Sequence, residues 1–253
     1  MKKIYSILLA ALLISGNVFA IDWDPRPQYQ FGVTVGWMDK MMRTVNGDNV
    51  TNLSLTNVDG KEKLGNTLQI GVNYTPTFNY GIGLNVGVYY EWTWNNNMED
   101  LGFGKFEAKC NNHEISIPIR AQWSLGITDN MTVYVFTGPS FDFGLLYSQR
   151  FRLYGLDGNL DEKGFVNAYS GKYNVGSKIA SIAGFPSSGE GKNDNWKEYK
   201  AFHPYWGFGV GFQWEYLRLQ VTSDWGIMNV SNHPDKQIYF NKPIAISFSY
   251  LFK

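Results

Sequence analysis

The stretch 81–94 alternates between apolar and small or polar side chains without a break. One face of this stretch carries aliphatic and aromatic residues, and the other carries glycine, asparagine, tyrosine, glutamate and threonine. Because neighbouring side chains of a β-strand point to opposite faces, the pattern predicts one long strand with one apolar face. A strand of about 9–11 residues crosses a bilayer at the usual tilt, so this strand is long enough to cross and to protrude.

The same alternation recurs in seven further segments, which makes eight predicted strands. The other segments are 29–37, 67–75, 114–124, 131–147, 206–214, 217–227 and 244–252. The segment 131–147 is the least regular, because Tyr134 and Phe136 share a face with the polar Asp142. Proline has no N–H for the ladder, so we expect a bulge or bend at Gly138 and Pro139, and Pro118 raises the same expectation.

Short and long connections alternate along the predicted strands. The short ones lie near 76–79, 128–130 and 215–216, and the long ones include 38–66, 95–111 and 148–199. This asymmetry is typical of outer-membrane barrels, which have short periplasmic turns and longer extracellular loops. We therefore predict an all-β fold, a closed eight-stranded antiparallel up-and-down transmembrane β-barrel in residues 21–253 with both termini in the periplasm. The alternative is a soluble sandwich whose aromatics fill a core.

Aromatic residues gather near the ends of the predicted strands. Aromatics make up 17% of the chain, while charged residues also reach only 17%, below the roughly 25% of ordinary globular proteins. We predict two girdles at the membrane interfaces. The outer girdle comprises Trp37, Trp92, Trp94, Trp206 and Trp225, and the inner one comprises Tyr74, Tyr80, Trp123, Trp214, Tyr250 and Phe252.

The chain begins with the features of a secretory signal peptide, which we assign to residues 1–20. Lysines at positions 2 and 3 precede an apolar stretch, 4–14, and a small-residue ending at Ala20. The alternative, a membrane helix, needs a longer apolar stretch than this one. The formal net charge is zero, so we expect no nucleic-acid partner. We predict Sec-dependent export to the bacterial outer membrane.

Four segments resemble the PorT-like family of outer-membrane β-barrels of Bacteroidetes-type bacteria. They are 115–120 (ISIPIR), 138–144 (GPSFDFG), 224–231 (DWGIMNVS) and 247–252 (SFSYLF). The resemblance implies the barrel architecture and no shared catalytic signature, and some members resemble accessory parts of secretion systems. The terminal aromatic Phe252 resembles the signal read by the barrel-assembly machinery, although Lys253 follows it.

Several charged residues fall on the inward faces of the predicted strands. They are Glu91, Glu114, Arg120, Asp142, Glu215, Arg218 and Asp224. The interior of an eight-stranded barrel is just wide enough for its side chains, so we expect these charges to pair and to close the lumen. The alternative is a narrow channel for small solutes, since inward glycines could leave room. If Glu91 and Glu114 are adjacent, one must be protonated or a cation must lie between them; a different register would keep them apart.

The sequence contains no motif for catalysis, a cofactor or a metal, and we expect none of the three. His113, His203 and His233 fall at the predicted rim, which leaves a lipid-modifying barrel enzyme as a further alternative. The segment 157–161 (DGNLD) copies half of an EF-hand loop. Glu162 stands where that loop needs glycine, so we expect a polar hairpin tip there.

The segment 148–199 is the longest predicted connection, and we expect it either to fold over the barrel mouth as a lid or to present a surface to a partner. We predict a monomer that acts through its extracellular loops in binding, adhesion or envelope and secretion support. Its expected partners are outer-membrane lipid, the barrel-assembly machinery and an unidentified extracellular or envelope protein.

The single cysteine, Cys110, excludes an internal disulfide, and we expect a membrane-impermeant maleimide to reach it from outside the cell.

Overall fold

The computed structural model of the chain describes residues 28–45, 61–102, 104–182, 188–194, 197–234 and 236–252. Eight long antiparallel strands form a ring in the order β4-β3-β2-β1-β11-β10-β9-β5, and pairing of β5 with β4 closes it. These strands are β1 (Gln28–Val45), β2 (Lys61–Thr77), β3 (Ile82–Asp100), β4 (Lys105–Thr128), β5 (Met131–Tyr154), β9 (Phe202–Trp214), β10 (Leu217–Gly226) and β11 (Gln237–Phe252). The predicted eight-stranded barrel is therefore confirmed. The predicted signal peptide, 1–20, lies outside the described residues.

Three tight turns lie at one end of the barrel, where the sequence predicted them. β2 joins β3 through the short 3-10 turn η1 (Asn79–Gly81), and β4 joins β5 through a turn at Asn130. β9 joins β10 through Glu215, whose backbone N–H donates to the carbonyl oxygen of Asn130 at 2.9 Å. Glu215 has a φ of 52° and is exposed. The prediction that Glu215 faces the lumen was wrong, because the turn takes its side chain out of the strand alternation.

At the opposite end the strands continue far beyond their predicted limits. β1 runs to Val45 and β2 starts at Lys61, so much of the expected 38–66 loop is strand. β3 and β4 stay paired out to Asp100 and Lys105, which replaces most of the expected 95–111 loop. The outer face of these extensions is mainly polar, with residues such as Arg43, Asn96 and Asp100, so it lacks the regular apolar pattern by which the sequence identified strands.

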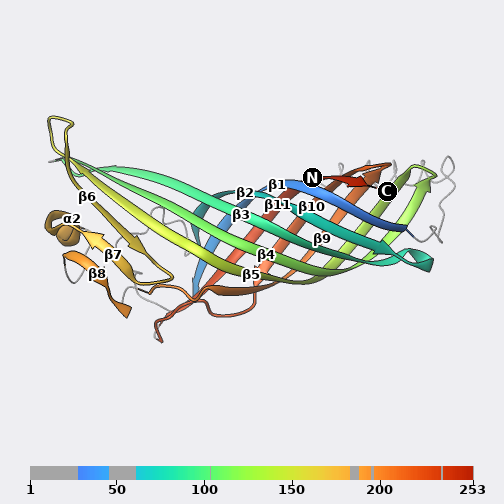
Figure 1. Ribbon diagram of the computed structural model, residues 1–253. Coiled ribbons are helices and arrows are strands. Elements are labelled where there is room, and N and C mark those ends of the chain that lie inside the picture. The colour runs from blue at the N-terminus through green and yellow to red at the C-terminus, as the bar shows by residue number, and fades with distance from the viewer. Residues whose placement is uncertain are drawn as a thin grey trace, which may run out of the picture.

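The strand β5 pairs with different neighbours along its length. Its inner part, 131–143, pairs with β9, and its outer part, 148–154, pairs with β6 (Leu160–Asn167). The sheet then continues through β7 (Lys172–Val175) and β8 (Gly189–Lys192), which pair with each other. The helix α2 (Ser177–Ile182) lies in the connection from β7 to β8. Figure 1 shows this extension at the end of the molecule opposite to the end of β11. The segment predicted as the longest loop therefore contains strands that extend the barrel sheet.

At Gly138 and Pro139 the expected irregularity takes the form of an interrupted pairing with β4, between Thr137 and Ser140, without a register shift, while β5 keeps a single register with β9. Gly138 takes a φ of 152°, and a Cβ there would lie 2.6 Å from the carbonyl oxygen of Ile119. This position therefore favours glycine. The β4–β5 register shifts farther out, next to Glu114, where Leu145 is the extra residue.

The wall of the barrel changes character along its length. In the half of the barrel nearest the three tight turns, which we call the inner part, apolar side chains cover the outside of the wall. Ile70 and Val210, for example, are each 57% exposed. Beyond the outer tryptophans, polar side chains such as Arg150 take the outside, and apolar side chains such as Phe106 and Phe151 are buried. Large contiguous apolar surfaces on a protein mark contact with a membrane or a partner. The inner part thus has the surface of a lipid-facing wall, and the outer part has that of a water-soluble domain.

The extension has an apolar core of its own. The core consists of Phe106, Ala108, Phe151, Leu153, Val166, Val175, Ile179 and Ala180. Ile179 of α2 is fully buried in it, and the rings of Phe106 and Phe151 stack at 5.9 Å. No helix among the described residues is long and apolar enough to cross a membrane. Burial of these side chains away from water stabilises the extension.

Candidate functional site

Aromatic side chains lie on the outer wall at two levels. Trp206 and Trp225 are cross-strand partners at the outer level, and Trp214 and Leu217 are partners at the inner level. None of the predicted girdle residues Trp37, Trp92, Trp94, Trp123, Trp206, Trp214, Trp225, Tyr250 and Phe252 is buried. The eight-residue separation of Trp206 and Trp214 spans roughly 26 Å along β9, or about 20 Å along the barrel axis at the usual tilt. The levels therefore fit the two edges of an apolar belt.

Inward-facing aromatic rings fill the inner part of the lumen. Tyr89, Tyr134 and Phe136 are at most 5% exposed. A Cβ on Gly211 would lie 2.1 Å from the ring of Tyr134, and one on Gly209 would lie 2.3 Å from the ring of Phe136. The inward glycines thus make room for these rings, which occupy the space that the channel alternative would have left open.

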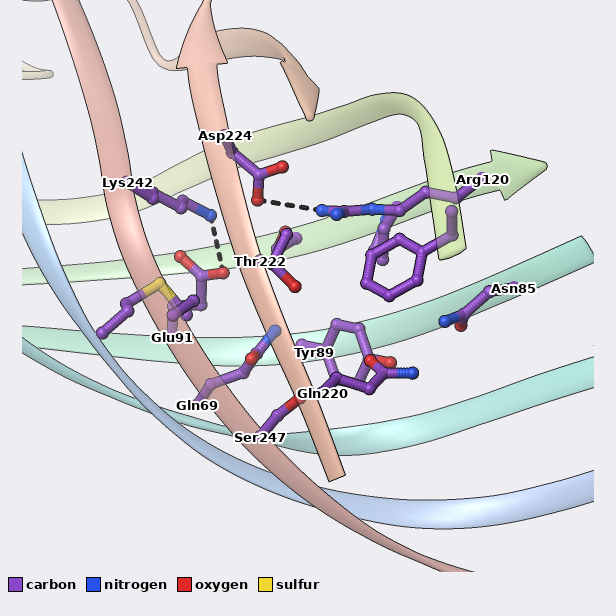
Figure 2. Close-up of a pocket in the computed structure, with 15 residues that line it drawn as sticks. Gln69, Asn85, Tyr89, Glu91, Arg120, Gln220, Thr222, Asp224, Lys242 and Ser247 are labelled. Atoms are coloured by element: carbon purple, nitrogen blue, oxygen red, sulfur yellow. Dashed lines mark hydrogen bonds and ion pairs between the residues drawn. The ribbon is translucent and has the colours of Figure 1, made fainter. Parts of the chain in front are cut away.

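A small cavity remains among the polar side chains of the lumen. It has a volume of about 30 Å³ and is lined by Tyr89, Gln220 and Asp224, among others (Figure 2). Such a volume holds roughly one or two water molecules. Beside it, Nη2 of Arg120 donates to Oδ2 of Asp224 at 2.8 Å, and both side chains are nearly buried. The volume of the cavity is that of a gap between packed side chains.

The buried guanidinium of Arg218 is held by neutral groups. Nη1 donates to the hydroxyl of Thr75 at 2.7 Å, and Nη2 donates to the side-chain oxygen of Gln122. The guanidinium also lies over the ring of Tyr134, 3.9 Å from its centre, in a cation–π contact. The expectation that the inward charges pair with one another therefore holds for Arg120 and Asp224 and was wrong for Arg218.

Three carboxylates from neighbouring strands meet farther out in the lumen. Glu91 of β3 and Glu114 of β4 are direct cross-strand partners, so these two predicted neighbours are adjacent. Asp142 of β5 joins them, and oxygen atoms of all three lie within 4.8 Å of one another. Each residue is at most 1% exposed. Buried carboxylates at such distances require positive partners or protons.

Two buried lysines supply most of the positive charge. Nζ of Lys242 lies 2.7 Å from Oε1 of Glu91 and 2.6 Å from Oδ2 of Asp142 (Figure 2 draws the contact with Glu91). Lys40 forms an ion pair with Oε2 of Glu114. Both lysines are at most 2% exposed. Among the described residues, the carboxylates of Glu91, Glu114 and Asp142 lie close enough together to hold a metal ion. In this structure their oxygen atoms contact the ammonium groups of the two lysines.

The buried imidazole of His203 completes the cluster. Its Nδ1 lies 3.1 Å from Oε1 of Glu114, and its Nε2 contacts the backbone carbonyl oxygen of Lys200. The carbonyl oxygen of Lys200 can only accept, so Nε2 of His203 is the ring nitrogen that donates to it. Oε1 of Glu114 also accepts from the Tyr169 hydroxyl and from Asn112, each at 2.9 Å. Three carboxyl groups thus lie among two ammonium groups and the imidazole of His203.

An apolar plug closes the barrel above this charged cluster. Its buried members are Met42, Leu64, Cys110, Tyr147, Ala168, Tyr199, Tyr205, Val230, Ile238 and Phe240. Ala168 and Tyr199 come from the segment 148–199, as does Tyr169, which packs against the plug. This part of the segment therefore covers the mouth, in agreement with the lid interpretation, while its outer part forms the extension.

The three histidines predicted at the rim lie in separate environments. The ring of His113 is on the outer wall, parallel to that of Trp92 and in contact with the Tyr90 hydroxyl. His203 is inside the barrel. His233 lies in the turn before β11, where its backbone N–H donates to the Ser231 hydroxyl at 3.0 Å. They do not converge on one another.

The tip at 157–161 forms a local turn. Both the backbone N–H and the side-chain amide of Asn159 donate to the carboxylate of Asp157, at 3.1 and 2.6 Å. These hydrogen bonds belong to a polar hairpin tip, as expected from the sequence.

Cys110 lies in the plug and is only 4% exposed. It pairs with Asn95, just beyond the outer tryptophans, so it lies outside the lipid-facing belt. Burial raises the pKa of its thiol to about 12. The expectation that a maleimide reaches Cys110 was therefore wrong, because the strand continues through this residue and turns it inward.

No protein-family model matches the sequence, and no curated protein sequence matches it. Among solved structures, the chain is similar to Ail, the attachment invasion locus protein of Yersinia pestis, in a complex with the heparin analogue sucrose octasulfate. The identity is 11%, the TM-score is 0.37, and the match covers 89% of this chain and 99% of Ail. Neisserial surface protein A matches with 8% identity and a TM-score of 0.37, over 92% of this chain and 99% of that one. Matches at this level establish neither a family nor a function for the chain.

Proposed function

We propose that the chain is an integral outer-membrane protein with a closed barrel, and that its extracellular extension is a binding surface for adhesion or for envelope or secretion support. The observation that carries this proposal is the inversion of the wall, which is apolar outside between the girdles and polar outside beyond them. Only helices and closed barrels satisfy their backbone hydrogen bonds in lipid, and the ring of eight strands is closed.

The extension supports a binding role because spanning the membrane does not require it. It buries its own apolar core and stands beyond the plug that closes the barrel. A folded platform of this kind presents its outer side chains in fixed positions, which favours recognition of a partner. The identity of that partner, a monomeric state and insertion by the barrel-assembly machinery are parts of the same proposal.

The three tight turns and the β11 end are assigned to the periplasm, since short turns face the periplasm in barrels of this kind. The leader at 1–20 is the proposed export signal. The resemblance of four segments to PorT-like barrels motivates the proposed role in envelope or secretion support. No reaction is proposed, because the three histidines lie apart.

The competing function, a narrow channel, leads to a direct test. Purified protein in a planar bilayer is expected to show no stable unitary conductance, because the lumen holds a cavity of only about 30 Å³ below the plug. A bilayer treated with detergent alone is the control. Stable, uniform conductance steps that depend on the protein would contradict the closed barrel.

Surface labelling tests the proposed orientation. Leu156, at the tip beyond β5, is 82% exposed, and Asp129 is exposed in the β4–β5 turn at the other end. We expect Leu156→Cys to react with a membrane-impermeant maleimide in intact cells, and Asp129→Cys to react only after the outer membrane is opened. Cys110 is expected to stay unlabelled in the unsubstituted chain until it is unfolded, so it adds no background.

Two outcomes would contradict these expectations. Labelling of Asp129→Cys in intact cells, with Leu156→Cys protected, would invert the topology. Rapid labelling of folded Cys110 would show that the plug does not cover that side chain.

A further inference from the structure

Beyond the outer girdle, the outer face of β4, β5 and β6 carries a group of cations that we call the basic ladder. Its members are Lys105, Lys109, Arg150, Arg152 and Lys163. Lys109 and Arg150 are direct cross-strand partners, and so are Arg152 and Lys163. Arg150 and Arg152 are next to each other on one face of β5 and both are exposed. Four cations thus occupy adjacent positions on one face of the sheet.

The ladder has little internal compensation. Glu107 lies 2.9 Å from Lys109 and 3.6 Å from Arg152, and the hydrogen bond from Lys109 is the main cause that lowers the pKa of this carboxyl. Neither Arg150 nor Lys163 forms an ion pair with any described residue. Like charges directly opposite each other destabilise a sheet. The other face of this sheet is fixed inward by its apolar core, so the cations cannot turn away.

Acidic residues at the margins do not remove this excess. Asp100 faces Lys105 across the strands, at the far end of the ladder. Asp161 is already paired with Lys178 of α2, at 2.7 Å. Arg152 and Lys109 share the single carboxylate of Glu107, so this group of cations keeps an excess of positive charge that an anion from outside the chain can meet.

The direction in which these cations point, and their height above the membrane, indicate which anion they meet. Lys109 has the same parity on β4 as Ile115 and Ile117, so it points sideways from the wall, as the lipid-facing residues do. It is four residues beyond His113, which is about 13 Å along the strand and about 10 Å along the membrane normal. That height is in or just above the lipid headgroup region, since headgroups add roughly 5–8 Å on each side of the hydrocarbon.

Apolar side chains lead up to the ladder on the same wall. Leu145 is 59% exposed and Leu146 is 37% exposed, and both precede Arg150 on β5. A lipid at this place would meet leucines with its acyl chains and arginines with its headgroup. We propose that the basic ladder binds the phosphate groups of an anionic glycolipid in the outer leaflet. This inference rests on the proposed membrane orientation, and it names a ligand for the outer face of the extension, whose partner the proposed function leaves unidentified.

The test compares two matched double variants. Arg150→Gln with Arg152→Gln removes two charges from the ladder. Lys172→Gln with Lys192→Gln removes two charges from another exposed cross-strand pair, on β7 and β8. Each protein is refolded into phosphatidylcholine vesicles that contain lipopolysaccharide or its dephosphorylated form, and the glycolipid retained by the barrel is measured after extraction into neutral detergent. A recovered β-sheet circular dichroism spectrum confirms that each variant has folded.

The unsubstituted protein is expected to retain phosphorylated glycolipid in a salt-sensitive way. Each charge removed near an anionic surface weakens binding roughly fivefold, so the ladder variant is expected to bind about 25-fold more weakly. The β7–β8 variant is expected to match the unsubstituted protein, and the dephosphorylated glycolipid is expected to bind as weakly as the ladder variant does.

Three results would overturn the proposal. If the ladder variant retained as much glycolipid as the unsubstituted protein, the arginines would not be part of the site. If dephosphorylated glycolipid were retained as well as the phosphorylated form, the phosphate groups would not be what the ladder binds. Displacement by inorganic phosphate or by a soluble sulfated polysaccharide, at concentrations matched for anionic groups, would assign the ladder to an anion in solution. Failure of the membrane orientation is separate, because labelling of Leu156→Cys reports it without any glycolipid.

Discussion

Lys242→Met is expected to lower the free energy of unfolding of the barrel by about 3–5 kcal/mol, the range for breaking a buried ion pair by removal of one partner. The ammonium group of Lys242 lies between Glu91 and Asp142, at 2.7 and 2.6 Å, and all three side chains are almost fully buried. Methionine keeps much of the side-chain volume and removes the charge. Two carboxylates would then lie close together without their shared cation. Urea titration of the protein folded into vesicles measures the loss.

Two matched variants separate the charge effect from loss of packing. Lys178→Met breaks an exposed ion pair with Asp161, and exposed pairs contribute about 0–1 kcal/mol, so little change is expected. Adding Glu91→Gln and Asp142→Asn to Lys242→Met removes the unpaired charges, and most of the lost stability is expected to return. Equal losses for Lys242→Met and Lys178→Met would contradict a buried charged cluster.

The fold was predictable because the inner part of the barrel carries its apolar residues on the outside. Segments such as 206–214 alternate clearly, since every second residue faces out and the intervening ones are mainly glycine. The strand count, the three tight turns and the outward facing of the girdles followed from this alternation. In β5 the alternation is masked, because Tyr134 and Phe136 are large residues that face the lumen and fill space above inward glycines.

The outer part of the molecule was not predictable from the same pattern. There the apolar side chains turn inward, as Met42 and Phe151 do, and charged residues take the outside. A search for apolar residues on the outer face therefore ends at the girdle and assigns the rest to loops. In β1 the alternation continues beyond Trp37, but its apolar side chains then lie on the inward face. A search that allowed the apolar face to change sides would have extended the predicted strand.

The charged cluster was half predictable. Its carboxylates, Glu91, Glu114 and Asp142, lie in strands that the sequence identified, so their inward facing followed from parity. Lys40 fell in an expected loop. Lys242 lies beyond a register shift in the pairing of β10 with β11, so the parity of Ile244 and its successors does not place it inward. Irregular pairing of this kind depends on neighbouring strands, which one strand's sequence does not reveal.

Val210→Arg is expected to cost about 2–4 kcal/mol of folding free energy in a bilayer, the range for a cation at the midplane of a barrel's lipid face. Val210 lies halfway between Trp206 and Trp214 on β9 and is 57% exposed in the isolated chain. Its cross-strand partners, Val135 and Val221, are also apolar and exposed. A residue this exposed would tolerate arginine in water, where surface substitutions usually stay within about 0.5 kcal/mol. The cost therefore measures contact with hydrocarbon.

Leu156→Arg is the matched control, because Leu156 is 82% exposed at the tip of the extension, away from the apolar belt. It is expected to change the free energy of unfolding by no more than about 0.5 kcal/mol. Urea titration in vesicles measures both variants, and brominated lipids give a second readout: Trp123, Trp214 and Trp225 are expected to be quenched because their rings lie on the outer wall. If Val210→Arg were as harmless as Leu156→Arg and the tryptophans were unquenched, the apolar wall would face something other than lipid, and the membrane assignment would fail.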